Sequence, residues 1–169
     1  MTSILKVTEI QDPTNSNSAL TVDSGGRVLQ PVKPIFMAVA DSTISLTTSY
    51  VELTSFSTAL VNVGGHYNTS TGRFTVPVAG TYSFAVASIA NTSSTVYRFR
   101  FYKNGSSLNE FELRVEPSGG AYGTNGEYCV YATLAVNDYI SIYAKSDNGT
   151  DAYANAAYRY AYFRGQLVG

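Results

Sequence analysis

The sequence contains no tryptophan, one histidine and one cysteine. The single cysteine, Cys129, cannot form a disulfide within the chain, and its position between Tyr128 and Val130 predicts a small buried strand residue. A Ser–His–Asp triad would require the single histidine, His66, but the Gly-x-Ser-x-Gly motif is absent. One His and one Cys also fall short of a zinc site. We therefore expect no enzyme, no metal centre and no cofactor.

Charged residues are scarce as well. They make up 14% of the sequence, compared with about 25% in typical soluble domains. Eleven basic and twelve acidic residues give a net charge of -1, so nucleic-acid binding is not expected. The sequence has no apolar run of about 18 residues that would predict membrane insertion. It also lacks a cationic segment followed by an apolar run, so no signal peptide is expected.

The sequence is instead rich in apolar and aromatic residues. Hydrophobic residues make up 44% of it, and it contains 14 Tyr and 8 Phe. Tyrosine is enriched at protein interfaces, where charged residues are depleted. The composition therefore predicts that much of the surface is buried against other chains.

The clearest strand pattern lies between Arg73 and Phe84. Pro77 has no N–H and ends one strand, and Gly80 begins the next. Side chains alternate between the two faces of a strand, so we expect a half-buried strand after Gly80. Its buried face carries Tyr82, Phe84 and Val86, and its other face carries Thr81, Ser83 and Ala85.

A hairpin is predicted around Asn104-Gly105, the strongest short-range hairpin signal. The strand before it alternates Tyr97, Phe99 and Phe101 with Arg98, Arg100 and Tyr102. The strand after it alternates Phe111, Leu113 and Val115 with Glu110, Glu112, Arg114 and Glu116. We expect Arg98 or Arg100 to pair with these carboxylates across the hairpin. No helix of ten or more residues is predicted.

A set of spaced residues resembles the signature of the C1q domain, part of the C1q/TNF-like superfamily. The matching positions are Phe56, Asn62, Tyr67, Phe74, Gly80, Tyr82 and Phe84. Val86 stands where the family usually has one more aromatic residue. The resemblance covers residues 35–168 and implies an all-β, antiparallel jelly-roll β-sandwich that assembles as a homotrimer.

The first 30 residues differ from the rest, with two short strand patterns, at 4–10 and 19–22, separated by turn residues. This opening resembles the amino-terminal segments of bacteriophage tail and fibre proteins. We interpret residues 1–30 as an extended attachment arm, 31–34 as an extended linker and 35–169 as the head. A flexible leader is the alternative interpretation of the arm.

Tyrosines also gather near the end of the chain. Tyr158, Tyr160 and Tyr162 share one face of a strand predicted at 158–168, whose other face carries Phe163. With aromatics on both faces, this strand is expected to be covered on both sides. We favour trimer contacts for the three tyrosines over the alternative, a sugar-binding platform.

The predicted function is that of a structural bacteriophage virion protein, similar to a tail or head fibre. Such a protein would be assembled in the host cytoplasm, bind a virion protein through residues 1–30 and contact a host-surface glycan or protein. The alternatives are a decoration protein without receptor binding and a secreted C1q-like ligand or lectin-like module.

Candidate receptor loops are 91–94, 104–109, 117–126 and 147–153, with Asn104, Tyr122, Asn125, Asp147 and Asp151 as candidate contacts. A calcium ion bound by loop oxygens is a further hypothesis. Its candidate ligands are Asp138, Asp147, Asn148 and Asp151, although their spacing does not match an EF-hand.

Overall fold

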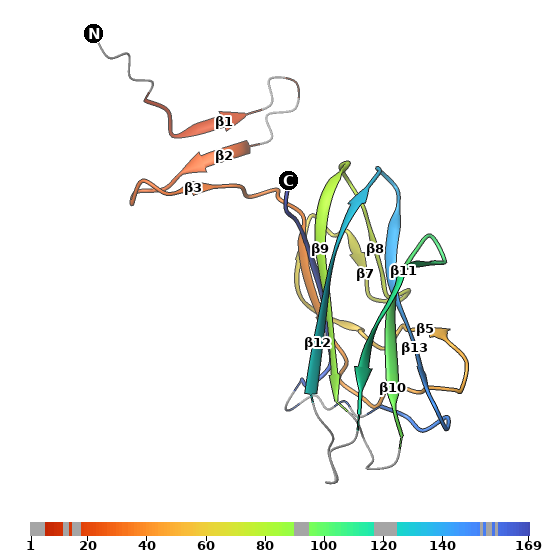
Figure 1. Ribbon diagram of the computed structural model, residues 1–169. Coiled ribbons are helices and arrows are strands. Elements are labelled where there is room, and N and C mark those ends of the chain that lie inside the picture. Colours follow the sequence, from red (N-terminus) through yellow and green to blue (C-terminus); the bar gives the residue numbers. More distant parts are fainter. Residues whose placement is uncertain are drawn as a thin grey trace. The chain divides into compact units, whose positions relative to one another are not determined.

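Figure 1 shows the computed structural model of the chain, in which strands are the only regular elements among the described residues. The described residues are 6–11, 14, 18–89, 95–116, 125–152, 154, 157 and 159–169. The chain divides into two compact units, Met1–Lys33 and Pro34–Gly169. No helix in the described part of the chain is long and apolar enough to cross a membrane.

The first unit is a small antiparallel sheet of β1 (Glu9–Gln11), β2 (Ser18–Val22) and β3 (Val28–Leu29), in that order. The sequence patterns predicted two strands here, and the third was missed because it has only two residues. Asp23 makes the turn before β3, because its Oδ1 accepts hydrogen bonds from the backbone N–H groups of Gly25 and Arg27, each at 2.9 Å.

The linker is not extended as expected. The N–H of Lys33 donates to the carbonyl of Gln30 at 3.1 Å, which closes a turn over residues 30–33. Pro31 occupies the second position of this turn, where the fixed φ of proline is favourable.

The second unit, which we call the head, is a sandwich of two antiparallel sheets. One sheet has the order β12-β9-β14-β4-β6, and the other has the order β11-β10-β13-β8-β7 with β5 beside β13. The predicted all-β antiparallel jelly roll is therefore confirmed. The strands are β4 (Ile35–Val39), β5 (Val51–Glu52), β6 (Thr58–Val63), β7 (Tyr67–Asn68), β8 (Arg73–Thr75), β9 (Gly80–Ile89), β10 (Tyr97–Lys103), β11 (Ser106–Val115), β12 (Asn125–Leu134), β13 (Tyr139–Ser146) and β14 (Tyr162–Leu167).

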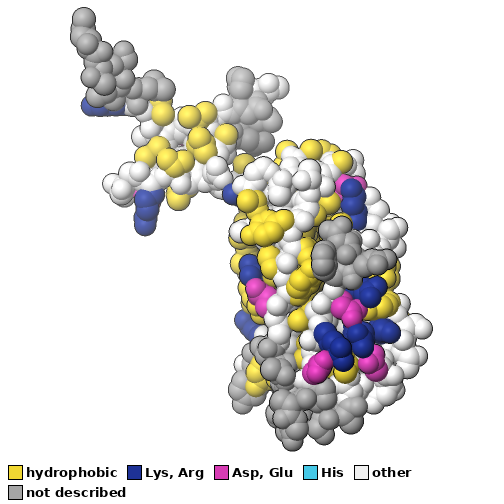
Figure 2. Space-filling model, in the orientation of Figure 1, with side chains coloured by type: hydrophobic (Ala, Val, Ile, Leu, Met, Phe, Trp, Pro, Cys, Tyr) yellow, Lys and Arg dark blue, Asp and Glu magenta, His cyan; other side chains and the backbone are white. Residues whose placement is uncertain are grey.

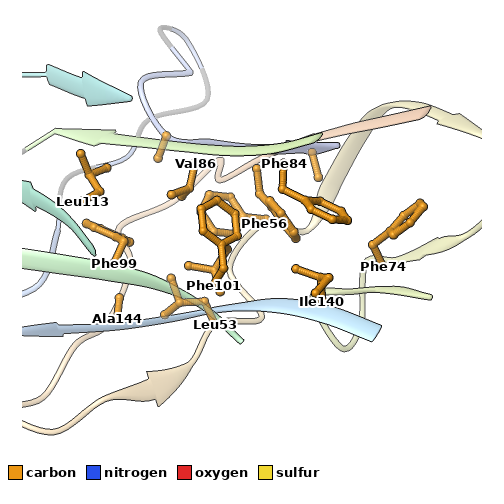
Figure 3. Packing of buried hydrophobic residues seen from close by; sticks show 14 of the residues in the cluster. Leu53, Phe56, Phe74, Phe84, Val86, Phe99, Phe101, Leu113, Ile140 and Ala144 are labelled. Atoms are coloured by element: carbon orange, nitrogen blue, oxygen red, sulfur yellow. The ribbon is translucent and has the colours of Figure 1, made fainter. Parts of the chain in front are cut away.

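Aromatic rings fill the space between the two sheets. Figure 3 shows Phe84 of β9 facing Phe101 of β10 across the interior, and their ring centroids lie 6.5 Å apart. Phe36 of β4 is central to the cluster, since it stacks on Tyr67 at 4.7 Å and on Phe74 at 4.8 Å. Such ring pairs stabilise a core beyond the area that they bury.

The signature residues lie in or beside this core. The side chain of Asn62 holds the backbone of Tyr67 from both sides, because its Nδ2 donates to the carbonyl at 2.8 Å and its Oδ1 accepts from the N–H at 3.0 Å. The buried Tyr67 hydroxyl donates to the carbonyl of Phe56 at 2.8 Å. Tyr82 donates similarly to the carbonyl of Val78 at 2.8 Å. These contacts give the signature a role in folding.

Two glycines allow close approaches around the last strand. A Cβ atom on Gly80 would lie 2.8 Å from Cδ1 of Leu167, so the start of β9 has no room for a larger residue. A Cβ atom on Gly165 in β14 would lie 2.4 Å from a ring carbon of Phe84 and 2.7 Å from one of Phe36. The aromatic core therefore extends up to the backbone of β14.

Several predicted boundaries and environments were wrong. The expected loop 104–109 is a tight turn at Asn104 and Gly105, followed directly by β11. Asn125 is the first residue of β12 rather than part of a loop. The last strand begins at Tyr162, since Arg159 has a positive φ of 50° that is incompatible with a strand.

Strand β9 is not half-buried, because both of its faces are covered. Ser83, Ala85 and Ala87 point away from the core, yet they are 8%, 1% and 2% exposed. Their larger neighbours on β12 and β14 cover them. Cys129, by contrast, was expected to be buried and is exposed. It points outward because Tyr128 and Val130, on the alternate face, point toward the core.

Candidate interaction surfaces

The outer face of the sheet β12-β9-β14-β4-β6 consists mainly of apolar and small side chains. We call it the apolar face. Strand β9 lies between the edge strand β12 and the central strand β14, and in the middle of its length it contributes the small residues Ser83, Ala85 and Ala87. The strand register defines three rows across the sheet. They are Tyr131–Ser83–Gln166–Ile35–Val63, Cys129–Ala85–Arg164–Met37–Val61 and Glu127–Ala87–Tyr162–Val39–Thr58.

Larger apolar side chains are exposed on the two edge strands of this sheet, β12 and β6. Tyr131 on β12 is 67% exposed, and Leu60 and Val61 on β6 are 41% and 40% exposed. Charge among the described strand residues of this sheet is limited to Glu127 and Arg164, which form an ion pair at 3.0 Å. An exposed apolar patch of this kind is typical of a protein–protein contact.

A shallow hollow lies on this face between β4, β6 and β14. Its volume is about 150 Å3, and Ile35, Phe36, Met37, Val61, Arg164, Gly165 and Gln166 line it. The hollow could receive an apolar side chain from a neighbouring molecule.

Tyr162 lies at the edge of the apolar face and is half-buried. Its hydroxyl donates to the carboxylate of Glu127. Burial and this hydrogen bond raise the pKa of Tyr162, while the hydrogen bond is the main cause that lowers the pKa of Glu127. Of the other two predicted trimer contacts, only Tyr160 is among the described residues, and it does not lie on a strand with Tyr162. Tyr160 is half-buried before β14, and Tyr158 lies outside the described residues.

The outer face of the other sheet is charged, and we call it the charged face. Figure 2 shows Lys and Arg gathered with Asp and Glu over β10 and β11. The predicted hairpin pairing is confirmed, since Glu112 accepts from Arg98 at 2.6 Å and from Arg100 at 3.0 Å. Burial disfavours ionisation of Glu112, but hydrogen bonds from Tyr50, Arg98 and Arg100 outweigh it and lower its pKa.

Tyrosine rings lie among these charges. The guanidinium of Arg100 lies 4.6 Å from the ring centroid of Tyr50, within the range of a cation–π contact. Arg73 binds Glu52 through two hydrogen bonds of 2.7 and 2.8 Å and lies 4.3 Å from the ring of Tyr139. These hydrogen bonds are the main cause of the lowered pKa of Glu52.

The candidate receptor residue Asn104 instead joins two turns of the head. Its Nδ2 donates to Asp138 at 2.7 Å, and its Oδ1 accepts from the N–H of Tyr139 at 2.8 Å. Lys103 forms an ion pair with Asp138 at 2.8 Å. Hydrogen bonds from Lys103, from the N–H of Ala135 and from Asn104 lower the pKa of Asp138 to about 2.

The candidate contacts Asp147 and Asp151 each bind another part of the head. Asp147 forms an ion pair with Arg98 at 2.9 Å, and Asp151 accepts from the N–H of Leu46 at 2.9 Å. The side chain of Asn125 and all of Tyr122 lie outside the described residues. Within the described part of the chain, no group of three His, Cys, Asp or Glu residues could hold a metal ion. The calcium hypothesis therefore has no clustered carboxylates to support it.

The sequence prediction missed the apolar face. Its signal was the run of small residues that alternates with Tyr82, Phe84 and Val86 along β9. The sequence analysis assigned these residues only to the other face of a half-buried strand, although they contain no charge. The arginine and carboxylate pairs were easier to predict, because both partners lie on one hairpin.

The C1q domain family matches residues 35–168 of the chain. Complement C1q tumor necrosis factor-related protein 5 of Homo sapiens is 40% identical over 101 residues, and the protein of that name from Rattus norvegicus is 39% identical. Each match covers 53% of the chain and 39% of the relative. The chain therefore spans less than half the length of these relatives.

Two solved structures share the fold. The globular domain of zebrafish complement 1qA protein has a TM-score of 0.59 at 22% identity, covering 81% of the chain and 98% of that domain. Murine APRIL has a TM-score of 0.59 at 9% identity, covering 80% of the chain and 98% of its own. At such identities the likeness concerns the fold alone.

Proposed function

Because the chain belongs to the C1q domain family, we propose that it is a non-enzymatic binding module that works as a homotrimer. The apolar face forms the contacts between the three heads, and the charged face remains in solvent for a partner. The observation that carries this proposal is the contrast between the two outer faces of one sandwich.

The contrast can be followed along the strands. On the apolar face, β9 carries the small residues Ser83, Ala85 and Ala87, and the edge strands β12 and β6 carry the exposed side chains of Tyr131 and Val61. A neighbouring molecule that packs on this face can therefore bury the exposed apolar side chains of both edge strands. Burial of apolar area stabilises a contact by roughly 25 cal/mol per Å2, before the costs of association are subtracted.

The charged face suits a different role. Arg98, Arg100 and Glu112 are held in fixed positions by mutual ion pairs, so they can present a defined pattern of charge to a partner. Tyrosine and arginine are also the side chains that most often dominate binding energy in protein interfaces. We propose a protein as the partner. Three copies of this surface in one particle would raise a weak affinity by avidity.

The bacteriophage interpretation receives no support from the relatives. The curated relatives named above are from rat and human, and their names refer to complement C1q. They favour the alternative of a C1q-like binding module over a virion protein that docks through residues 1–30. A location in a virion is therefore not part of our proposal.

Sedimentation of the purified chain tests the trimer. We expect the wild-type chain to sediment at about three times the 18.2 kDa of one copy at micromolar concentration. Val61→Asp places a carboxylate on the apolar face and should convert the trimer into monomers, because an unpaired charge is costly to bury.

Val136→Asp is the matched control. Val136 is 51% exposed and lies in the turn between β12 and β13, away from the apolar face. This variant should remain a trimer. A wild-type chain that sediments as a folded monomer, or a trimer that Val61→Asp leaves intact, would overturn the proposal.

A further inference from the structure

The small sheet in the first unit is too short to hold a core of its own. Its strands contain only three, five and two residues, and a sheet of this size needs a covered apolar face. A disulfide cannot stabilise it, since the sequence has no cysteine before Cys129. No metal-binding group occurs among the described residues. Association is the remaining means by which very small units are stabilised.

One face of this sheet is apolar across all three strands. Ile10 of β1 pairs with Leu20 of β2, and Val22 of β2 pairs with Val28 of β3. Leu20 and Val22 are two residues apart on one strand, so the four side chains share a face. Three of them remain open to solvent, with Ile10 48%, Val22 38% and Val28 63% exposed.

The connection to the head limits where this face can go. Residues 30–33 join β3 to the head, and four residues span at most about 14 Å even when extended. They are held in a turn by the Lys33–Gln30 hydrogen bond, which shortens their reach. The head begins at β4, a strand of the sheet whose outer surface is the apolar face. In the proposed trimer, three small sheets are therefore tethered to one assembly by short connections.

We infer that the small sheets of the three copies pack on one another through Ile10, Leu20, Val22 and Val28, as a second contact of the trimer. This inference rests on the proposed trimer of heads. Tethering favours the small sheet of a second copy as the partner of this apolar face. Short connections give the tethered sheets an effective concentration in the millimolar range. Each copy brings the same uncharged, β-branched or leucine surface, so apolar faces meet apolar faces.

Hydrogen exchange on the full-length chain tests the inference, with sedimentation of the same samples as a separate measurement of the head trimer. In the wild-type trimer, the backbone amides of β2 and β3 should be protected. Val28→Asp should leave the trimer intact but speed exchange in β2 and β3 by about tenfold or more, because the cover of the small sheet is lost.

Leu29→Asp is the control. Leu29 neighbours Val28 on β3, is 45% exposed and points to the opposite face. It should leave the protection unchanged. Val61→Asp, which separates the heads, should also remove the protection, since a lone copy has no neighbouring small sheet.

Other outcomes overturn the inference in distinguishable ways. Protection that persists in Val28→Asp trimers, or in Val61→Asp monomers, would mean that the small sheet is covered by its own chain. Unprotected amides in a wild-type trimer would mean that the small sheets do not associate, while the proposed function stands. A monomeric wild-type chain would overturn the proposed function and this inference together.

Discussion

Gly165 packs directly against the aromatic core, and a single methyl group added there should destabilise the head. The Cβ atom of Gly165→Ala would lie 2.4 Å from a ring carbon of Phe84 and 2.7 Å from one of Phe36. Both rings are fully buried, at 0% and 1% exposed, and both pack on Phe163. Neither ring can therefore move away without displacing another.

Added volume in a packed core costs typically about 1–3 kcal/mol, and we expect the upper part of this range. For a domain of this size, about 2–3 kcal/mol lowers the melting temperature by roughly 4–12 °C. Thermal unfolding followed by circular dichroism, at one fixed chain concentration, measures the shift. The concentration must be fixed because association stabilises the folded state.

Gly169→Ala is the matched control, since a Cβ atom on Gly169 would meet nothing within 4 Å. A double variant tests the mechanism. Phe84→Leu removes the ring atoms that the new methyl meets, so Gly165→Ala should cost at least about 1 kcal/mol less in that background than in the wild type. The reasoning fails if Gly165→Ala is as stable as Gly169→Ala, or if the two core substitutions are additive.

Three further predictions concern polar contacts. Tyr67→Phe leaves the carbonyl of Phe56 without its hydroxyl donor and should lower the free energy of unfolding in urea by about 1–2 kcal/mol. Asp138 has its pKa lowered from 3.8 to about 2, mainly by Lys103, so the stability that it contributes is present above pH 3.8 and is lost as the pH falls toward 2. The free energy of unfolding of the wild type should fall more steeply over that pH interval than that of Asp138→Asn. Equal slopes would contradict the lowered pKa of Asp138. Glu112→Gln removes the carboxylate shared by two arginines and should cost about 1 kcal/mol in urea unfolding, less in high salt.

The aromatic signature was identified by its resemblance to the C1q domain, and several of its contacts are also determined locally. The spacing from Asn62 to Tyr67 places an amide beside the backbone that it binds, and the alternation of Tyr82 and Phe84 directs both rings inward. Asn-Gly at 104–105 predicted the hairpin for the same reason, since both residues adopt positive φ in the turn. The information needed for these predictions lies within a few residues of each predicted position.

The apolar face could not be predicted in this way, because it combines residues from strands far apart in the sequence. Ala85 is buried by its neighbours on β12 and β14, and nothing near Ala85 in the sequence reports their size. The orientation of Cys129 was ambiguous, since both of its sequence neighbours are apolar and neither phase of the alternation was excluded. The tyrosines near 160 misled the prediction, because the backbone conformation of Arg159 interrupts the alternation that they suggested.

The first and last strands of the head lie side by side, and this allows the chain to be rewired. Gln166 of β14 pairs with Ile35 of β4, and the N–H of Leu167 donates to the carbonyl of Pro34 at 3.0 Å (Figure 1). A short peptide joining these two strands, with new ends opened in an exposed turn such as 70–71, would give a circular permutant that retains the strand pairings. A cargo fused at the new ends would then be attached at the turn between β7 and β8 instead of at the original ends of the chain.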